Sequence, residues 1–228
     1  MQKMSSPAIG EHAVAMALSL ARGIVRYGKA MPAGKWRSDM TRDPGMFSVS
    51  GKTMLVVGLG GIGTAAARRA NALGMRVIAT RNSSREGPAF VDYVGLSNEL
   101  PKLLGEADII VNALPLTSST AGMFDRALFA RVKPAAYFIN VGRGGTVVTD
   151  ALVEALESGR LAGAGLDVTD PEPLPSDHPL WQMSNVIITP HVSWAGADRR
   201  LHSMLLRENI RRYLAGDALL NVVDPERG

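Results

Sequence analysis

Three observations predict an α/β protein built on a doubly wound parallel sheet. Short apolar runs alternate with helical stretches along the chain, as in parallel strands whose connecting helices cover both faces of a sheet. A glycine-rich turn follows the first apolar run and opens a helix. The composition, 46% hydrophobic and 20% charged over 228 residues, is that of a globular protein with enough apolar material for a core.

Each predicted strand is a short, mostly apolar run that is typical of strands buried on both faces. In chain order these runs are TMLVVG at 53–58, MRVIAT at 75–80, DIIVNAL at 108–114, AYFINV at 136–141, GAGLDV at 163–168 and NVIITP at 185–190. Helices are predicted between them at 62–73, 97–104, 125–131 and 149–158. The proline-rich stretch DPEPLPSDHPL at 170–180 predicts a loop, because proline removes a backbone donor and fixes φ.

Composition also excludes several classes of protein. No run of eighteen apolar residues is present and the first residues lack a secretory pattern, so we expect no membrane partner and a cytoplasmic location. The absence of cysteine excludes disulfides and thiolate chemistry, and no histidine has metal-ligand neighbours, so no metal is predicted. The net charge of +4 is modest, and the arginines of 199–212 are spaced like a solvated helix face, so no nucleic-acid partner is expected.

The sequence GLGGIG, with Gly58, Gly60 and Gly63, has the spacing of a dinucleotide-binding turn. Because it follows a predicted strand and opens a helix, its glycines can let the backbone approach a pyrophosphate at the helix N-terminus. A plain glycine-rich turn is the alternative. The upstream GMFSVSGKT resembles a P-loop, but five residues separate Gly45 from Gly51 where the loop needs four, and GKT enters a strand, so we reject it.

Parallel sheets bind ligands beyond the carboxyl ends of their strands, which directs attention to the residues just past each strand. These residues are Gly60, Arg81, Pro115, Arg143, Glu172 and His191. Taken singly, Arg143 could be a loop cation, Glu172 a solvated carboxylate and His191 a histidine bonded to backbone. Their shared position beside a nucleotide turn favours a site for proton transfer and anion binding.

Several long segments resemble the D-isomer-specific 2-hydroxyacid dehydrogenases, in the right order from about Gly10 to Asp224. They are GLGGIG, NALPLTSSTAGMFD, INVGRGGTVVTDALVEAL, GAGLDVTDPEPLPSDHPLW and NVIITPHVSWA. The resemblance implies that Arg143 of NVGRG binds the carboxylate and carbonyl of the substrate. It also implies that His191 of PH is the acid and base, and that Glu172 of DPEP supports that histidine.

The chemistry of reducing a 2-keto acid requires the same residue types. A histidine can deliver a proton to the developing alkoxide near neutral pH, and a neighbouring carboxylate keeps its ring protonated and oriented. An arginine can bind a carboxylate through two parallel hydrogen bonds. We therefore predict an oxidoreductase that transfers a hydride between NAD(P)H and a small glyoxylate- or hydroxypyruvate-like acid. A methyltransferase would leave these three residues unexplained.

The resemblance and the strand ends together define a predicted cofactor site. Its residues are Gly58, Gly60, Gly61, Ile62, Gly63, Arg81, Asn82, Ser83, Leu114, Pro115, Thr120, Val141, Gly142, Arg143, Asp167, His191 and Trp194. Trp194, shortly after His191, also indicates a partly apolar substrate pocket.

The resemblance also predicts the domain organisation. Residues 1–28 match the family's connecting helix, which packs on a partner subunit and is apolar on nearly every face from Ile9 to Val25, so we expect a homodimer. Residues 29–195 are predicted to form the dinucleotide-binding domain, and 196–228 a helix that completes a substrate lobe. The lobe itself, roughly 100 residues in length, has no counterpart in the sequence. We therefore expect either a truncated product or fragment, or a partner lobe that comes from elsewhere. A non-catalytic nucleotide-binding or dimerisation module is the alternative function.

The stretch VIATRNSSR, at 77–85, is basic where an NAD-binding domain usually has an acid. Arg81 lies 18 residues after Gly63, where an Asp or Glu would bind the adenosine ribose. Arg81, Asn82 and Ser83, with Arg85 nearby, offer donors without a carboxylate that would repel a 2′-phosphate. We therefore predict a preference for NADP(H), with NAD(H) possible. The alternative is a solvated turn whose arginine stacks on adenine.

Overall fold

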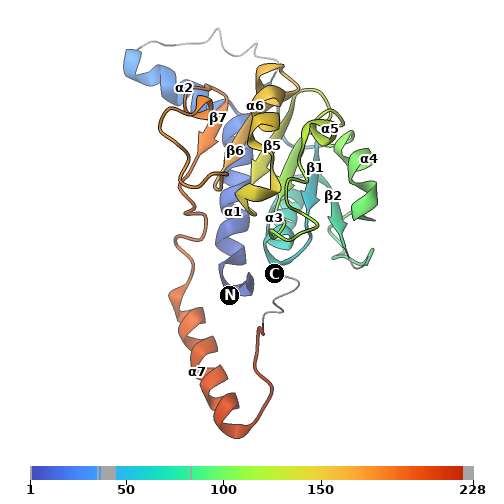
Figure 1. The fold of residues 1–228 in the computed structure, drawn as a ribbon, viewed down its shortest axis with the longest axis vertical. Coiled ribbons are helices and arrows are strands. Elements are labelled where there is room, and N and C mark those ends of the chain that lie inside the picture. The colour runs from blue at the N-terminus through green and yellow to red at the C-terminus, as the bar shows by residue number, and fades with distance from the viewer. Residues whose placement is uncertain (1, 35, 37–44, 83, 223–228) are drawn as a thin grey trace.

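The computed structural model describes residues 2–34, 36, 45–82 and 84–222, and it contains the predicted parallel sheet (Figure 1). The strands are β1 (Thr53–Val57), β2 (Arg76–Arg81), β3 (Tyr93–Leu96), β4 (Ile109–Asn112), β5 (Ala136–Asn140), β6 (Leu161–Leu166) and β7 (Val186–Ile188). Their order is β3-β2-β1-β4-β5-β6-β7, and all the pairings are parallel. The order reverses beside β1, so the crevice between the chain segments that leave β1 and β4 is the expected ligand site of a doubly wound sheet.

Helices cover the two faces of the sheet and enclose two apolar cores. They are α1 (Gln2–Ala21), α2 (Ile24–Ala30), α3 (Gly61–Ala72), α4 (Leu100–Leu104), α5 (Arg126–Phe129), α6 (Thr149–Glu157) and α7 (Arg199–Ala215). Short 3-10 turns are η1 (Met31–Ala33), η3 (Ser97–Glu99), η4 (Gly144–Thr146) and η5 (Pro179–Trp181). Helices α1 and α3 contribute to one core, and α4, α5 and α6 to the other. Because both faces are covered, the central strands are mostly apolar and buried, as the sequence predicts.

Three elements differ from the sequence-based prediction. The strand β3 was not predicted, because only four residues, one of them a glycine, form this edge strand. The helix predicted at 97–104 is divided into η3 and α4. The N-terminal helix ends at Ala21, since Gly23 adopts a left-handed backbone with φ of 66° that glycine tolerates without a steric penalty, and α2 restarts the helical path.

The helix α1 packs against the sheet through one face only. Its buried side chains include Ala13, Val14, Met16, Ala17 and Leu20. Glu11 and Ala15 on the other side are exposed, so the burial on all sides that its sequence predicts is not reached within one chain. Gly10 lies against α3, and a Cβ at this position would be 2.7 Å from the Cβ of Ala65. The helix therefore packs on the sheet and on α3 of the same chain.

The helix α7 extends away from the sheet (Figure 1). Its apolar side chains are largely in contact with solvent, and Tyr213 and Leu214 are 76% and 80% exposed. Among the residues that the structure describes, no helix has the length and hydropathy to cross a membrane.

Candidate active site

The glycine turn shapes one wall of a crevice at the carboxyl edge of the sheet. Gly58 has a φ of 93°, and a Cβ at Gly63 would lie 2.2 Å from the Gly58 carbonyl oxygen, so both positions require glycine. Gly60 precedes α3 and leaves the first N–H groups of the helix facing the crevice, where they favour an anion. The crevice has a volume of about 340 Å³ and is lined by Gly58, Leu59, Gly60, Gly61, Ile62, Arg81, Asn82, Ala113, Leu114, Pro115, Gly142 and Arg143.

Arg81, the last residue of β2, and Asn82 begin the basic turn of the sequence RNSSR and form one end of this crevice. Arg81 donates from Nη1 to the carbonyl of Glu86 at 2.8 Å, which fixes one side of its guanidinium and leaves other N–H groups for a ligand. The Oδ1 of Asn82 accepts a hydrogen bond from Ser97 Oγ at 3.2 Å. The side-chain amide of Asn82 therefore has its N–H groups available as donors. Ser83, also predicted to bind the cofactor, lies outside the described residues.

A buried network of amides holds the turns after β4 and β5. Asn112 donates from Nδ2 to Asn140 Oδ1 at 3.1 Å and to Thr146 Oγ1 at 2.8 Å. Asn112 Oδ1 accepts a hydrogen bond from the backbone N–H of Leu114 at 3.2 Å, and Asn140 Oδ1 accepts one from the N–H of Gly142 at 3.1 Å. Because unpaired buried amides are costly, these strand residues fix the path of the crevice walls.

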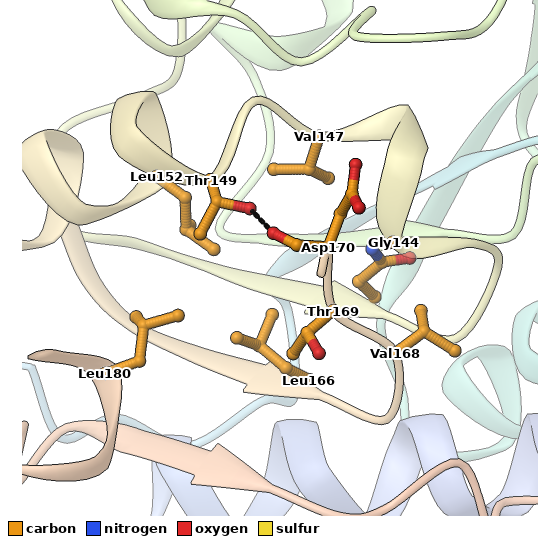
Figure 2. A pocket seen from close by; sticks show the side chains of 10 residues that line it. Gly144, Val147, Thr149, Leu152, Leu166, Val168, Thr169, Asp170 and Leu180 are labelled. Atoms are coloured by element: carbon orange, nitrogen blue, oxygen red, sulfur yellow. Dashed lines mark hydrogen bonds between the residues drawn. The ribbon is translucent and has the colours of Figure 1, made fainter. Parts of the chain in front are cut away.

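The turn that carries Arg143 lies against the acidic loop that follows β6. A Cβ at Gly144 would be 1.8 Å from the Thr169 carbonyl oxygen, so the two backbones approach as closely as glycine allows. Thr149 Oγ1 also donates to the Asp170 carbonyl at 2.5 Å (Figure 2). The cavity enclosed here holds only about 10 Å³, which is about the space of one water, so it is a packing feature between the loops. Arg143 itself lines the crevice and donates to the Gly142 carbonyl at 2.8 Å.

Glu172 and His191 form a hydrogen-bonded pair, although 19 residues separate them in the chain. The distance from His191 Nδ1 to Glu172 Oε1 is 2.6 Å, and the side chains are 41% and 43% exposed. A carboxylate accepts this bond from Nδ1–H, so Nε2 faces outward and can exchange a proton with a ligand. The pair therefore has the geometry of a general acid and base with an orienting carboxylate.

Asp167 holds the turn that presents His191. The His191 backbone has φ of 55°, uncommon for a residue with a Cβ, and its N–H donates to the Asp167 carbonyl at 2.8 Å. The Asp167 carboxylate is buried and accepts from Thr189 Oγ1 at 2.6 Å and from the N–H groups of Val192 and Ser193 at 2.9 and 3.1 Å. Asp167 was predicted to bind cofactor, but its carboxylate is turned into the protein and does not line the crevice.

The pKa of Asp167 reflects this environment. Burial acts to raise the pKa, but hydrogen bonds from Ser193, Thr189 and the backbone N–H of Val192 outweigh burial and lower it below its usual range. The ionised carboxylate is therefore the form that the folded turn stabilises.

The predicted residues Thr120, Val141 and Trp194 do not line the crevice. Thr120 donates from Oγ1 to the Pro115 carbonyl at 2.6 Å, and Val141 is buried. Trp194 is 53% exposed and donates from Nε1 to the His191 carbonyl at 3.0 Å. No group of three or more His, Asp or Glu side chains in the described part of the chain could hold a metal ion.

Four residues of this site were not predicted from the sequence. Leu59 and Ala113 line the crevice between residues that were predicted, so their place inside the two motifs was the available signal. Asn112 and Asn140 are polar residues at the ends of otherwise apolar strands, a pattern that indicates a buried polar role.

The crevice and the Glu172–His191 pair follow different strands of one doubly wound sheet, and neither Glu172 nor His191 lines the crevice. Together they define a class of dinucleotide-binding domain, and comparison with known proteins identifies the family. Residues 14–193 match the model of the D-isomer specific 2-hydroxyacid dehydrogenase, NAD binding domain. The chain belongs to this family, and both the predicted family and the predicted fold are confirmed.

Characterised relatives and solved structures are similar over nearly the whole chain. A glyoxylate/hydroxypyruvate reductase B from Enterobacter sp. (strain 638) is 37% identical over 219 residues, which cover 95% of this chain and 67% of the relative. A family member from Xanthobacter autotrophicus Py2, solved in complex with NADPH and MES, has a TM-score of 0.86 and 35% identity and covers 98% of this chain and 89% of its own.

An NADPH-dependent glyoxylate/hydroxypyruvate reductase from Sinorhizobium meliloti, solved with NADP and sulfate, has a TM-score of 0.85 and 33% identity over 98% of this chain and 70% of its own. An uncharacterised protein from Corynebacterium melassecola is 40% identical over 78% of this chain but only 58% of its own length. The chain thus spans about 58% to 68% of the length of the curated relatives it matches.

The buried carboxylate of Asp167 predicts an acid-dependent stability. In the folded protein the pKa of the Asp167 carboxyl is below the usual value of about 3.9. The stabilisation that the ionised carboxylate gives to the folded state is therefore fully present above a pH of about 3.9. It is lost as the pH falls through the folded pKa. Asp167→Asn should lower the free energy of unfolding by about 1–3 kcal/mol at pH 6, because an amide N–H then faces backbone donors. Urea unfolding should show a smaller difference in the free energy of unfolding between wild type and variant at pH 3 than at pH 6. An equal difference at pH 3 and pH 6 would contradict this role.

Proposed function

We propose that the chain binds NADP(H) in the crevice and prefers it to NAD(H). The observation that carries this proposal is the crevice end formed by Arg81 and Asn82, since the described residues that line the crevice include no carboxylate. Charge-assisted bonds from arginine to phosphate are strong, and a missing acid removes the repulsion of a 2′-phosphate. The similar proteins solved with NADPH or NADP support the assignment.

We further propose that the bound cofactor exchanges a hydride with a small 2-keto or 2-hydroxy acid of the glyoxylate or hydroxypyruvate kind. The reduced nicotinamide supplies the hydride. His191 supplies the proton from Nε2, because Glu172 occupies Nδ1 and orients the ring. Arg143, at the crevice wall, binds the carboxylate and polarises the neighbouring carbonyl. Relatives named glyoxylate/hydroxypyruvate reductase, hydroxypyruvate reductase and glyoxylate reductase support this substrate class.

The proposed organisation has three parts. Residues 29–195 form the dinucleotide-binding domain. Residues 1–28, which include α1 and most of α2, join a second copy through the outer face of α1 in a homodimer in the cytoplasm. Residues 196–228 complete a substrate lobe, which the exposed apolar side chains of α7 support. If no such lobe covers the site, lobe closure cannot exclude water. The chain then binds cofactor but turns substrate over poorly, which is the non-catalytic alternative.

Arg81→Asp should reverse the cofactor preference. Titration by cofactor fluorescence should show wild-type chain binding NADPH at least roughly tenfold tighter than NADH, a ratio worth about 1.4 kcal/mol. The variant should lose NADPH affinity and keep or gain NADH affinity, because the new carboxylate repels the 2′-phosphate and can bond the ribose hydroxyls. Arg76→Asp, an equal charge change at the other end of β2, is the control. Equal loss for both cofactors in Arg81→Asp would indicate adenine stacking instead.

His191→Gln should lower turnover by roughly a hundredfold or more while NADPH affinity stays unchanged, because general acids contribute about 10² to 10⁴ in rate. The measurement is the fall of NADPH absorbance with glyoxylate, hydroxypyruvate and pyruvate, using the chain or a longer protein that contains it. His178→Gln, in the proline-rich loop, is the matched control. Turnover that is the same in wild type and His191→Gln would remove this histidine from the mechanism.

A further inference from the structure

The second arginine of the basic turn, Arg85, is bound to groups outside the crevice. Its Nη2 lies 2.9 Å from Glu99 Oε1, and its Nη1 donates to Tyr93 Oη at 3.0 Å. Tyr93 Oη in turn donates to Glu99 Oε2 at 2.5 Å, and the backbone N–H of Leu96 donates to Glu99 Oε1 at 2.7 Å. Both of these contacts of the Arg85 guanidinium are with the Glu99–Tyr93 pair, and Arg85 is not among the residues that line the crevice.

Glu99 belongs to the segment that supports the phosphate end of the crevice. Leu96 is the register partner of Arg81 in the pairing of β2 with β3, and Ser97 donates to Asn82. Glu99 follows two residues after Ser97 in η3, and its Oε1 accepts a hydrogen bond from the N–H of Leu96, the residue paired with Arg81.

The Glu99 carboxylate remains charged at working pH. The hydrogen bond from Tyr93, together with those from the Leu96 backbone and Arg85, lowers its pKa to about 2. A carboxylate with this pKa is ionised at any pH used for cofactor binding. Without a counter-charge it would repel a bound phosphate.

We propose that Arg85 determines cofactor specificity by neutralising Glu99, and that it does not itself bind the 2′-phosphate. The inference rests on the proposed binding of NADP(H). Arg81 and Asn82 hold the phosphate, while Arg85 cancels the charge of the acid beside them. Repulsion between a carboxylate and a phosphate dianion at roughly 10 Å corresponds to a few-fold change in affinity, and it acts only on the cofactor that carries the phosphate.

Two other roles for Arg85 give different results. If Arg85 bound the phosphate directly, its loss would weaken NADPH binding whether or not Glu99 carried a charge. If the pair were only a surface ion pair, its loss would change neither cofactor's affinity, because such pairs contribute little. The double variant Arg85→Ala/Glu99→Gln separates these roles, since glutamine keeps the shape of the side chain without its charge.

The experiment is a fluorescence titration of the whole chain with NADPH and with NADH. Arg85→Ala should weaken NADPH binding by roughly three- to tenfold, and NADH affinity should stay within about twofold, which also shows that the variant is folded. Arg85→Ala/Glu99→Gln should return the NADPH affinity to near the wild-type value. The deficit of Arg85→Ala should shrink at high salt, where the Debye length falls to about 3 Å. Arg76→Ala, which breaks the exposed pair with Glu106 at the start of β2, should change neither affinity.

Two results would contradict the proposed role of Arg85. NADPH binding as weak in the double variant as in Arg85→Ala would show a direct phosphate contact, and an unchanged affinity in Arg85→Ala would show a surface pair alone. Either result overturns the inference about Arg85. The proposed function still stands in that case if the wild-type chain prefers NADPH. Equal wild-type affinities for NADPH and NADH would overturn the proposed preference, and this inference with it.

Discussion

Buried polar groups at the carboxyl edge of the sheet determine where the functional side chains lie. A carboxylate or amide that is removed from water must find partners, and here the partners are backbone groups of the loops that carry the site. Asp167 binds two successive N–H groups and a hydroxyl of the turn around His191. Asn112 and Asn140 do the same for the turns that lead to Pro115 and Arg143. The strands thus position the loops through hydrogen bonds that are too costly to leave unmade.

The reversal of strand order gives these loops a common place to meet. Because β1 and β4 are neighbours and their connections leave on opposite sides, the glycine turn and the chain at Ala113–Pro115 separate and open a crevice. The β2–β3 side carries the basic turn, and the β5–β7 side carries Arg143, Glu172 and His191. One edge of a single sheet therefore carries both the crevice and the Glu172–His191 pair.

Much of this arrangement could be predicted from the sequence, because the relevant signals are local. Continuous apolar runs predicted six of the strands in the described chain, and the glycine spacing predicted the turn before α3. The pairing of Glu172 with His191 follows from strand ends that share an edge. The orientation of Asp167 could not be predicted in this way, because it depends on the left-handed backbone of His191 and on tertiary hydrogen bonds. The sequence likewise grouped Arg85 with Arg81, whereas contacts across β3 direct Arg85 to Glu99.

The most direct test of this account is a structure of the chain with NADPH bound. The account predicts the pyrophosphate against the N–H groups at Gly60 to Ile62, the 2′-phosphate on Arg81 and Asn82, and the nicotinamide between Pro115 and Arg143 on the side of His191. It also predicts that Arg85 remains on Glu99 in the complex. A cofactor bound away from this crevice, or bound with its 2′-phosphate in solvent, would contradict the account.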